Sequence, residues 1–129
     1  MGAPLLIAVV DDDESVRESL PDLLREFGFA VHAYASAEAF LDSGQIEATA
    51  CLILDVAMPG MCGPDLQREL HRRGHALPVI FITAHADAAE RPRLMNQGAV
   101  DCLLKPFSEA ALLRALSTAL PVSPGPSTP

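Results

Sequence analysis

The chain has 129 residues, half of them hydrophobic, and its 17 acidic and 9 basic side chains give a formal net charge of −8. This length suits one domain with one substantial core. The negative charge argues against binding of nucleic acid or an anionic membrane by this domain. Lys105 is the only lysine, beside 17 carboxylates.

The cysteines indicate a reducing environment. Cys51, Cys62 and Cys102 form no CxxC pair and lack the spacing of zinc ligands. An odd number of scattered cysteines argues against a disulfide framework. No apolar run reaches the roughly 18 residues of a membrane span, and the first residues lack the basic start of a signal peptide. We therefore expect a cytoplasmic protein that does not enter a membrane.

Five short apolar runs have the length of β-strands and alternate with amphipathic stretches. Apolar runs of this kind suit strands that are buried on both faces of a parallel sheet. Five such strands alternating with five helices predict a doubly wound α/β domain. The runs are Leu5–Val10, Ala30–Tyr34, Ala50–Leu54, Pro78–Ile82 and Val100–Leu104.

The stretches between the runs carry helix start and stop signals. Gly28 and Gly98 are placed as C-terminal caps of the first and fourth helices. Pro64 suits the first turn of the third helix, which we expect to stop near Gly74. Ser108 is a suitable N-cap for the fifth helix.

Two prolines conflict with uninterrupted helices. Pro21 falls inside the first helical pattern and Pro92 inside the fourth. An interior proline removes a hydrogen bond and costs about 3 kcal/mol unless the helix bends or restarts. We expect a kink at Pro21, and a late start that puts Pro92 in the first turn of the fourth helix.

The composition changes after residue 120. Residues 121–129 contain four of the eleven prolines and no charged side chain. This composition is typical of an extended linker or tail that cannot build a core. We expect a globular domain over residues 4–120, followed by a Pro-rich flexible linker to a further domain or by a loose tail.

Polar side chains follow four of the five expected strands. The carboxyl ends of parallel strands share one edge of the sheet, so these side chains should meet there. Asp12 and Asp55 would repel each other unless a cation lay between them, and an open cluster of oxygens suits Mg²⁺ or Mn²⁺. The residues are Asp11 and Asp12 after the first strand, Asp55 after the third, Thr83 and Ala84 after the fourth, and Lys105 after the fifth.

This set of residues predicts phosphoryl chemistry. Asp55 would attack the phosphorus of a donor and become an acyl phosphate, while Mg²⁺ neutralises the transferring charge. Lys105 would pair with one phosphoryl oxygen and the hydroxyl of Thr83 with another. Movement of Thr83 towards the new charge would then bias a two-state surface.

The same residues stand in motifs that resemble the receiver (CheY-like) domain of two-component response regulators. The resemblance covers about residues 4–120. Each motif is weak by itself, but all four occur in the order and spacing of that family. They are Val9–Asp13, Leu54–Gly60 with Gly63, Ile82–Ala84, and Lys105–Phe107.

The resemblance implies a flavodoxin-like (βα)5 fold with strand order 2-1-3-4-5, and roles for the acidic residues. Asp55 would be the phosphoacceptor, in a domain that assists its own phosphorylation and dephosphorylation without being an enzyme in its own right. Asp12, Asp55 and the carbonyl of Ala57 would ligate Mg²⁺, with Asp11 acting through water. Ala57 and His85 would influence how fast the acyl phosphate hydrolyses, although His85 can equally be read as a solvated loop histidine.

The resemblance also assigns the remaining residues of this edge. Thr83, Ala84 and Lys105 would contact the phosphoryl group, and the bond between Lys105 and Pro106 would be cis. The family usually carries an aromatic residue three positions before the lysine, where this chain has Cys102. We expect Cys102 to be a buried or half-buried small hydrophobe, which puts the aromatic part of the switch in doubt.

The partners implied are those of a phosphorelay. The phosphodonor would be a phosphohistidine on a sensor histidine kinase or a phosphotransfer protein. Ser36–Phe40 and Gly98–Asp101 resemble the subgroup with a LuxR-type helix-turn-helix output domain, which would regulate transcription. A homodimer would use the face of the helix ending at Gly98, the strand Val100–Leu104 and the helix after Ser108.

Two other functions compete with this hypothesis. An aspartyl-nucleophile phosphatase would use Asp11 as nucleophile and Asp13 as general acid, but it leaves Asp55 without a role. Asp13 is otherwise a charge at the helix start that complements the helix dipole, or an accessory to the acidic site. A flavin-binding module of the same fold is disfavoured, because carboxylates stand where its phosphate would bind.

Overall fold

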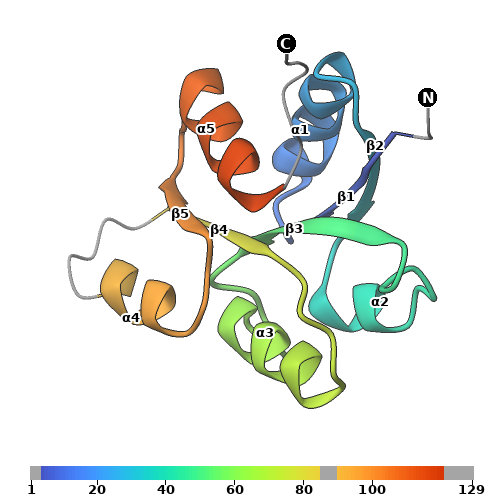
Figure 1. Cartoon of the computed structure of the whole chain (residues 1–129), viewed down its shortest axis with the longest axis vertical. Helices are drawn as coiled ribbons and strands as arrows, with labels where there is room; N and C mark the ends of the chain where they lie inside the picture. Colours follow the sequence, from blue (N-terminus) through green and yellow to red (C-terminus); the bar gives the residue numbers. More distant parts are fainter. Residues whose placement is uncertain (1–3, 85–89, 121–129) are drawn as a thin grey trace, which may run out of the picture.

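The computed structural model describes residues 4–84 and 90–120, which form one parallel sheet flanked by helices (Figure 1). The strand order is β2-β1-β3-β4-β5, as the family resemblance implied. The elements are β1 (Leu6–Val10), α1 (Glu14–Glu26), β2 (Ala30–Tyr34), α2 (Ala37–Leu41), β3 (Thr49–Asp55), α3 (Gly63–Arg72), β4 (Val79–Thr83), α4 (Glu90–Asn96), β5 (Asp101–Leu104) and α5 (Glu109–Ala119).

Helices cover both faces of the sheet, α1 and α5 on one side and α2, α3 and α4 on the other (Figure 1). Successive side chains of β1 point to opposite faces of the sheet, so the strand contributes to the hydrophobic core on each face. Ile7 and Val9 pack in the cluster that contains Leu24 of α1 and Leu112 of α5. Ala8 and Val10 belong to the cluster on the opposite face. Burial on both faces explains why β1, β3 and β4 are apolar along most of their length.

The helix signals in the sequence are confirmed. The hydroxyl of Ser108 accepts a hydrogen bond from the N–H of Ala111 at 3.0 Å and so caps α5. Pro64 lies in the first turn of α3. That helix ends at Arg72, and Gly74 follows with a φ of +86°, in the left-handed region that glycine enters at little cost.

The two prolines behave differently. The described part of α4 begins at Glu90, and Pro92 is its third residue. Because residues 85–89 lie outside the described part of the chain, the late start of this helix stays a prediction. By contrast, α1 is one continuous helix in which Pro21 is an interior, buried residue. The helix therefore does not restart at Pro21, and the kink there stays a prediction.

Two strands end one residue later than the sequence indicates, so Asp55 and Thr83 end their strands rather than follow them. Asp55 pairs with Ile82, and Thr83 pairs with Leu104. The parallel ladder thus continues to the polar residues themselves. As a result, their backbone is fixed by the sheet and not by a loop.

The start of α3 lies directly against the end of β3. The N–H of Gly63 donates a hydrogen bond to the carbonyl of Val56 at 3.0 Å. A Cβ at Gly63 would clash with the backbone carbonyl of Asp55 and press on the ring of Phe81. Only glycine therefore lets the helix start this close to Asp55.

We expect Gly63→Ala to destabilise the fold, because the added methyl group meets backbone and not a flexible side chain. Overpacking of this kind costs about 1–3 kcal/mol. Urea unfolding of the two proteins measures the difference, with Cys62→Ala as the control at the neighbouring position. Equal unfolding midpoints for Gly63→Ala and the wild type would contradict the contact described here.

Candidate functional site

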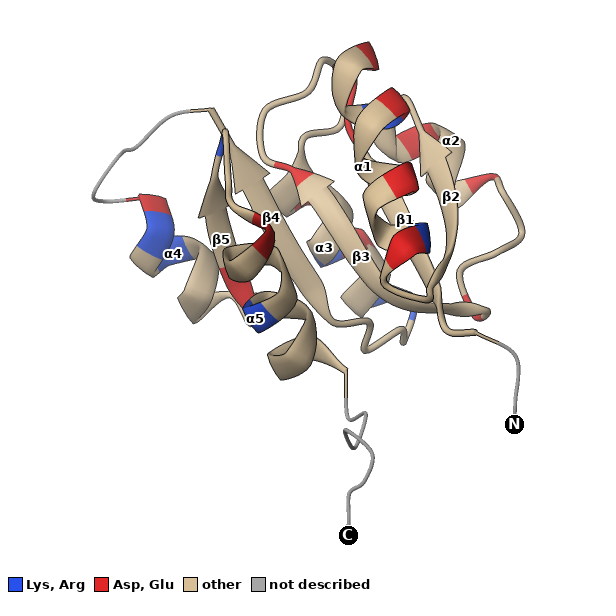
Figure 2. Ribbon diagram, turned by 90° about the horizontal axis from the view of Figure 1, so that it is seen from above, with Lys and Arg blue, Asp and Glu red and all other residues tan. Residues whose placement is uncertain are grey.

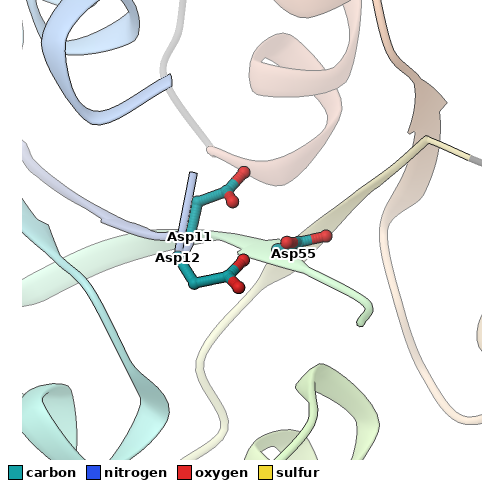
Figure 3. A group of neighbouring side chains, drawn as sticks. All are labelled: Asp11, Asp12 and Asp55. Carbon is teal, nitrogen blue, oxygen red and sulfur yellow. The ribbon is translucent and has the colours of Figure 1, made fainter. Parts of the chain in front are cut away.

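Three carboxylates meet at the carboxyl edge of the sheet. Asp11 and Asp12 follow β1, and Asp55 ends β3. One oxygen from each of the three lies within 4.8 Å of the others. Figure 3 shows the side chains of Asp12 and Asp55 extending into the same space beside Asp11. The structure therefore brings together the acidic residues that the sequence singled out.

Lys105 places a positive charge beside two of these carboxylates. Its Nζ lies 2.9 Å from Oδ2 of Asp11 and 3.8 Å from Oδ2 of Asp55. The residue follows β5, and its backbone N–H donates to the carbonyl of Thr83 at 2.7 Å. That bond ties the lysine to the end of β4, where Thr83 is itself buried.

Asp11 is fully buried and is fixed through several contacts. Its Oδ1 accepts a hydrogen bond from the N–H of Asp13 at 2.9 Å. The guanidinium of Arg17 donates to its backbone carbonyl at 3.0 Å. Its Oδ2 has the ammonium of Lys105 as an ion-pair partner but makes no well-directed hydrogen bond. One buried carboxylate oxygen therefore retains capacity for a further donor or a cation.

The electrostatics of the site favour a proton or a cation on Asp55. Burial, together with the hydrogen bond and charge of Asp11, raises the pKa of Asp55 from 3.8 to about 7, against the opposing effect of Lys105. Desolvation alone would lower the pKa of Lys105, but its contact with Asp11 and the charge of Asp55 outweigh this effect and raise it. The lysine therefore stays charged and compensates only part of the negative charge.

The donor set matches a hard divalent cation. Three carboxylates with an open side suit Mg²⁺, which prefers oxygen ligands and keeps several waters. Asp12 is exposed, whereas Asp11 and Asp55 are buried, so the cluster reaches from the interior to solvent. The exposed residue Ala57 lies in the adjoining β3–α3 connection. The residues present thus fit the ion that the sequence predicts.

The β3–α3 connection is held by a residue that the motifs did not assign to the site. Oε2 of Glu38 in α2 accepts a hydrogen bond from the N–H of Met61 at 3.1 Å. It also lies beside Gly60, where a Cβ would come within 3.0 Å of the same oxygen. Glu38 therefore links α2 to the connection that carries Ala57. No sequence signal points to this contact, since 23 residues separate the two partners.

The remaining site residues lie as follows. The Lys105–Pro106 bond is cis, as the resemblance implied. Cys102 is buried, with 8 % of its surface exposed, which confirms the prediction of a small buried hydrophobe. Burial raises the pKa of its thiol, which disfavours a redox role. Ala84 is exposed beyond β4, and His85 lies outside the described residues.

Comparison with known proteins identifies the class. Residues 7–117 match the response regulator receiver domain, and the chain belongs to this family. The response regulator protein TmoT of Ectopseudomonas mendocina is 47% identical over 120 residues, which is 92% of this chain and 54% of that protein. The transcriptional regulatory protein FixJ of Azorhizobium caulinodans is 43% identical over 120 residues, 93% of this chain and 57% of that protein.

Solved structures agree with this assignment. The response regulator StyR superposes with a TM-score of 0.83 at 46% identity, over 92% of this chain and 60% of that chain. The chemotaxis protein CheY4 of Vibrio cholerae gives 0.82 at 26% identity, over 92% of this chain and 100% of that chain. The chain spans about half the length of the curated relatives it matches. Among the described helices, none has the length and apolar character of a membrane span.

We expect the stability advantage of Asp55→Asn over the wild type to grow with pH in metal-free buffer. A carboxyl whose pKa rises on folding binds its proton more tightly in the folded state, so ionisation destabilises the fold. The free energy of unfolding of Asp55→Asn minus that of the wild type should increase between pH 3.8 and about 7 and stay constant at higher pH. Urea unfolding across this range measures it.

Asp22→Asn provides the control, because Asp22 is an exposed residue of α1 that lies outside the acidic cluster. It reports the effect of exchanging a carboxylate for an amide at a site away from the cluster. Addition of Mg²⁺ should stabilise the wild type more than Asp55→Asn. Parallel pH profiles for the wild type and Asp55→Asn would show that the carboxyl is not perturbed.

Proposed function

We propose that this receiver domain accepts a phosphoryl group on Asp55 from a phosphohistidine of a sensor histidine kinase or a phosphotransfer protein. The observation that carries the proposal is the meeting of three carboxylates and the ammonium of Lys105 at one edge of the sheet. An isolated acidic cluster would serve other purposes equally well. The lysine is what adapts this one to a transferring phosphoryl group.

In the proposed step, a carboxylate oxygen of Asp55 attacks the phosphorus. The P–N bond to the histidine breaks, the imidazole nitrogen leaves with the electron pair, and a P–O bond forms. Lys105 moves from its contacts with the carboxylates to pair with a phosphoryl oxygen. The hydroxyl of Thr83 and the backbone of Ala84, at the end of β4, supply contacts to the others.

Asp12, Asp55 and the backbone carbonyl of Ala57 would hold Mg²⁺ or Mn²⁺ directly, with Asp11 acting through water. When bound, the ion supplies positive charge that neutralises the acidic residues and the transferring group. In its absence the raised pKa of Asp55 leaves a fraction of the carboxyl protonated near neutral pH. Its nucleophilic form is then depleted, so phosphorylation depends on the cation.

We also propose that phosphorylation controls an output domain that follows residues 4–120. The linker assigned to residues 121–129 lies outside the described residues. Relatives named as transcriptional regulators support a DNA-binding output. The receiver itself would not bind DNA, because its basic residues are interspersed with acidic ones rather than gathered on one face (Figure 2). A homodimer through α4, β5 and α5 and a cytoplasmic location belong to the same proposal.

The phosphatase alternative is disfavoured by the state of Asp13. Its carboxylate caps α1, accepting hydrogen bonds from the N–H of Ser15 at 3.0 Å and from the hydroxyl of Ser15 at 2.8 Å. These bonds lower the pKa of Asp13. A general acid that protonates a leaving group needs the opposite shift.

Incubation with Mg²⁺ and acetyl phosphate should raise the intact mass by one phosphoryl group. Asp55→Asn should show no increase, because the amide cannot form the acyl phosphate. The control Asp22→Asn keeps the site and should behave like the wild type. The expected product is stoichiometric, so a generic phosphate ester should show little steady turnover.

Two results would contradict the assignment. An equal mass increase in Asp55→Asn would place the phosphoryl group elsewhere. Steady release of phosphate from the ester by the wild type, lost in an Asp13→Asn variant, would favour the phosphatase instead.

We expect both Lys105→Met and Lys105→Arg to slow phosphorylation by on the order of tenfold or more, the effect of losing one charge-assisted hydrogen bond. Arginine keeps the charge, but its broad planar guanidinium differs from the compact ammonium that lies 2.9 Å and 3.8 Å from two carboxylates. The rate of mass increase measures the effect, with Arg25→Met as a control. Wild-type rates for Lys105→Arg would show that charge alone suffices.

A further inference from the structure

An apolar groove lies at the edge of the domain opposite the acidic site. It has a volume of about 500 Å³ and is lined by residues before β1 and β2 and by the last two turns of α5. Because the strands are parallel, their amino ends lie at this edge and the carboxylates at the other. The lining includes Leu5, Phe27, Phe29, Leu113, Ser117 and Leu120.

The groove exposes apolar surface that the domain does not cover. Within residues 4–84 and 90–120, the large hydrophobic side chains exposed to solvent are Leu5, Leu104 and Leu113. Leu5 and Leu113, which are 39% and 42% exposed, both line the groove. Each exposed leucine is ordinary by itself, but together the two leave the rim of this groove open to contact with a further apolar group.

The residue after α5, Leu120, lies at this groove. Leu120 lines it and caps the helix in an extended conformation, with φ −106° and ψ 128°. The residues that follow in sequence are Pro121, Val122, Ser123, Pro124, Gly125 and Pro126. They therefore begin at the groove without any intervening connection.

The chemistry of that segment matches the lining. Neither the segment nor the lining contains a charged residue, whereas acidic residues recur along the nearby helix α1 (Figure 2). Proline-rich chains adopt an extended conformation that docks on grooves with aromatic walls and loses little entropy in doing so. Phe27 and Phe29 provide aromatic rings, and Ser117 provides a hydroxyl for a backbone carbonyl. Direct attachment at Leu120 makes the binding intramolecular.

We propose that residues 121–126 of this chain occupy the groove between α5 and the start of β2. The segment then covers Leu5 and Leu113 and runs along the edge of the domain where the amino ends of the strands lie. A domain joined through it would leave the receiver in a fixed direction. The docking does not depend on the phosphorylation of Asp55, since the groove and the carboxylates lie at opposite edges.

Backbone relaxation of the full ¹⁵N-labelled chain tests the proposal. The amides of Val122, Ser123 and Gly125 should have order parameters of about 0.8, as in ordered backbone. In Leu113→Glu, which puts a charge at the rim of the groove, they should fall below about 0.6. Leu104→Glu is the matched control, because Leu104 is 46% exposed and does not line the groove.

The possible results distinguish residues 121–126 from a second copy of the chain as the group that occupies the groove. Ordered amides in the wild type and in Leu104→Glu, with loss of order in Leu113→Glu, support the proposal. Order parameters below about 0.6 in the wild type, or equal values in the two variants, overturn it. Order that increases with protein concentration, together with a dimer in sedimentation that Leu113→Glu abolishes, also overturns it and assigns the groove to a second copy.

Discussion

Mutual repulsion of the carboxylates of Asp11, Asp12 and Asp55 is the constraint around which this domain is organised. The three groups lie within 4.8 Å, and two of them are buried. Such an arrangement costs stability unless positive charge compensates it. Lys105 supplies one charge from inside the protein, and the remainder is left for a proton or a cation. Repulsion that Lys105 leaves uncompensated is thus the property that favours binding of a cation at this cluster.

The parallel sheet is what makes this concentration of charge tolerable. Asp55 and Thr83 are the last paired residues of β3 and β4, so ladder hydrogen bonds hold their backbones. Gly63 brings the start of α3 against the carbonyl of Asp55, and Glu38 holds Met61 in the same connection. Repulsion between the side chains is therefore resisted by backbone contacts on several sides. A carboxylate on a loop could move away together with its backbone, whereas the backbone of Asp55 is held in the sheet.

The sequence was sufficient for the fold class and for the residues of the acidic edge, because both depend on local patterns, whereas the strand order was implied only by the family resemblance. Apolar runs specify buried parallel strands, and strand ends of a parallel sheet must share an edge. The contacts of Arg17 and Glu38 escaped prediction for a physical reason. Each side chain bonds to a backbone group on another element, the carbonyl of Asp11 or the N–H of Met61, and any backbone offers such groups. The type of residue that supplies the backbone carbonyl or N–H therefore does not help to predict these contacts from the sequence.

The outer edge of the sheet shows where this chain departs from its family pattern. Cys102 stands where the resemblance implied an aromatic residue, and its carbonyl accepts a hydrogen bond from the guanidinium of Arg91 in α4. Arg91 also donates to the carboxylate of Asp101 at 2.9 Å. The thiol is too small to make the large swing expected of an aromatic residue at this position. The Arg91 contacts join α4 to the start of β5, so any displacement of α4 has to break them or carry the start of β5 along.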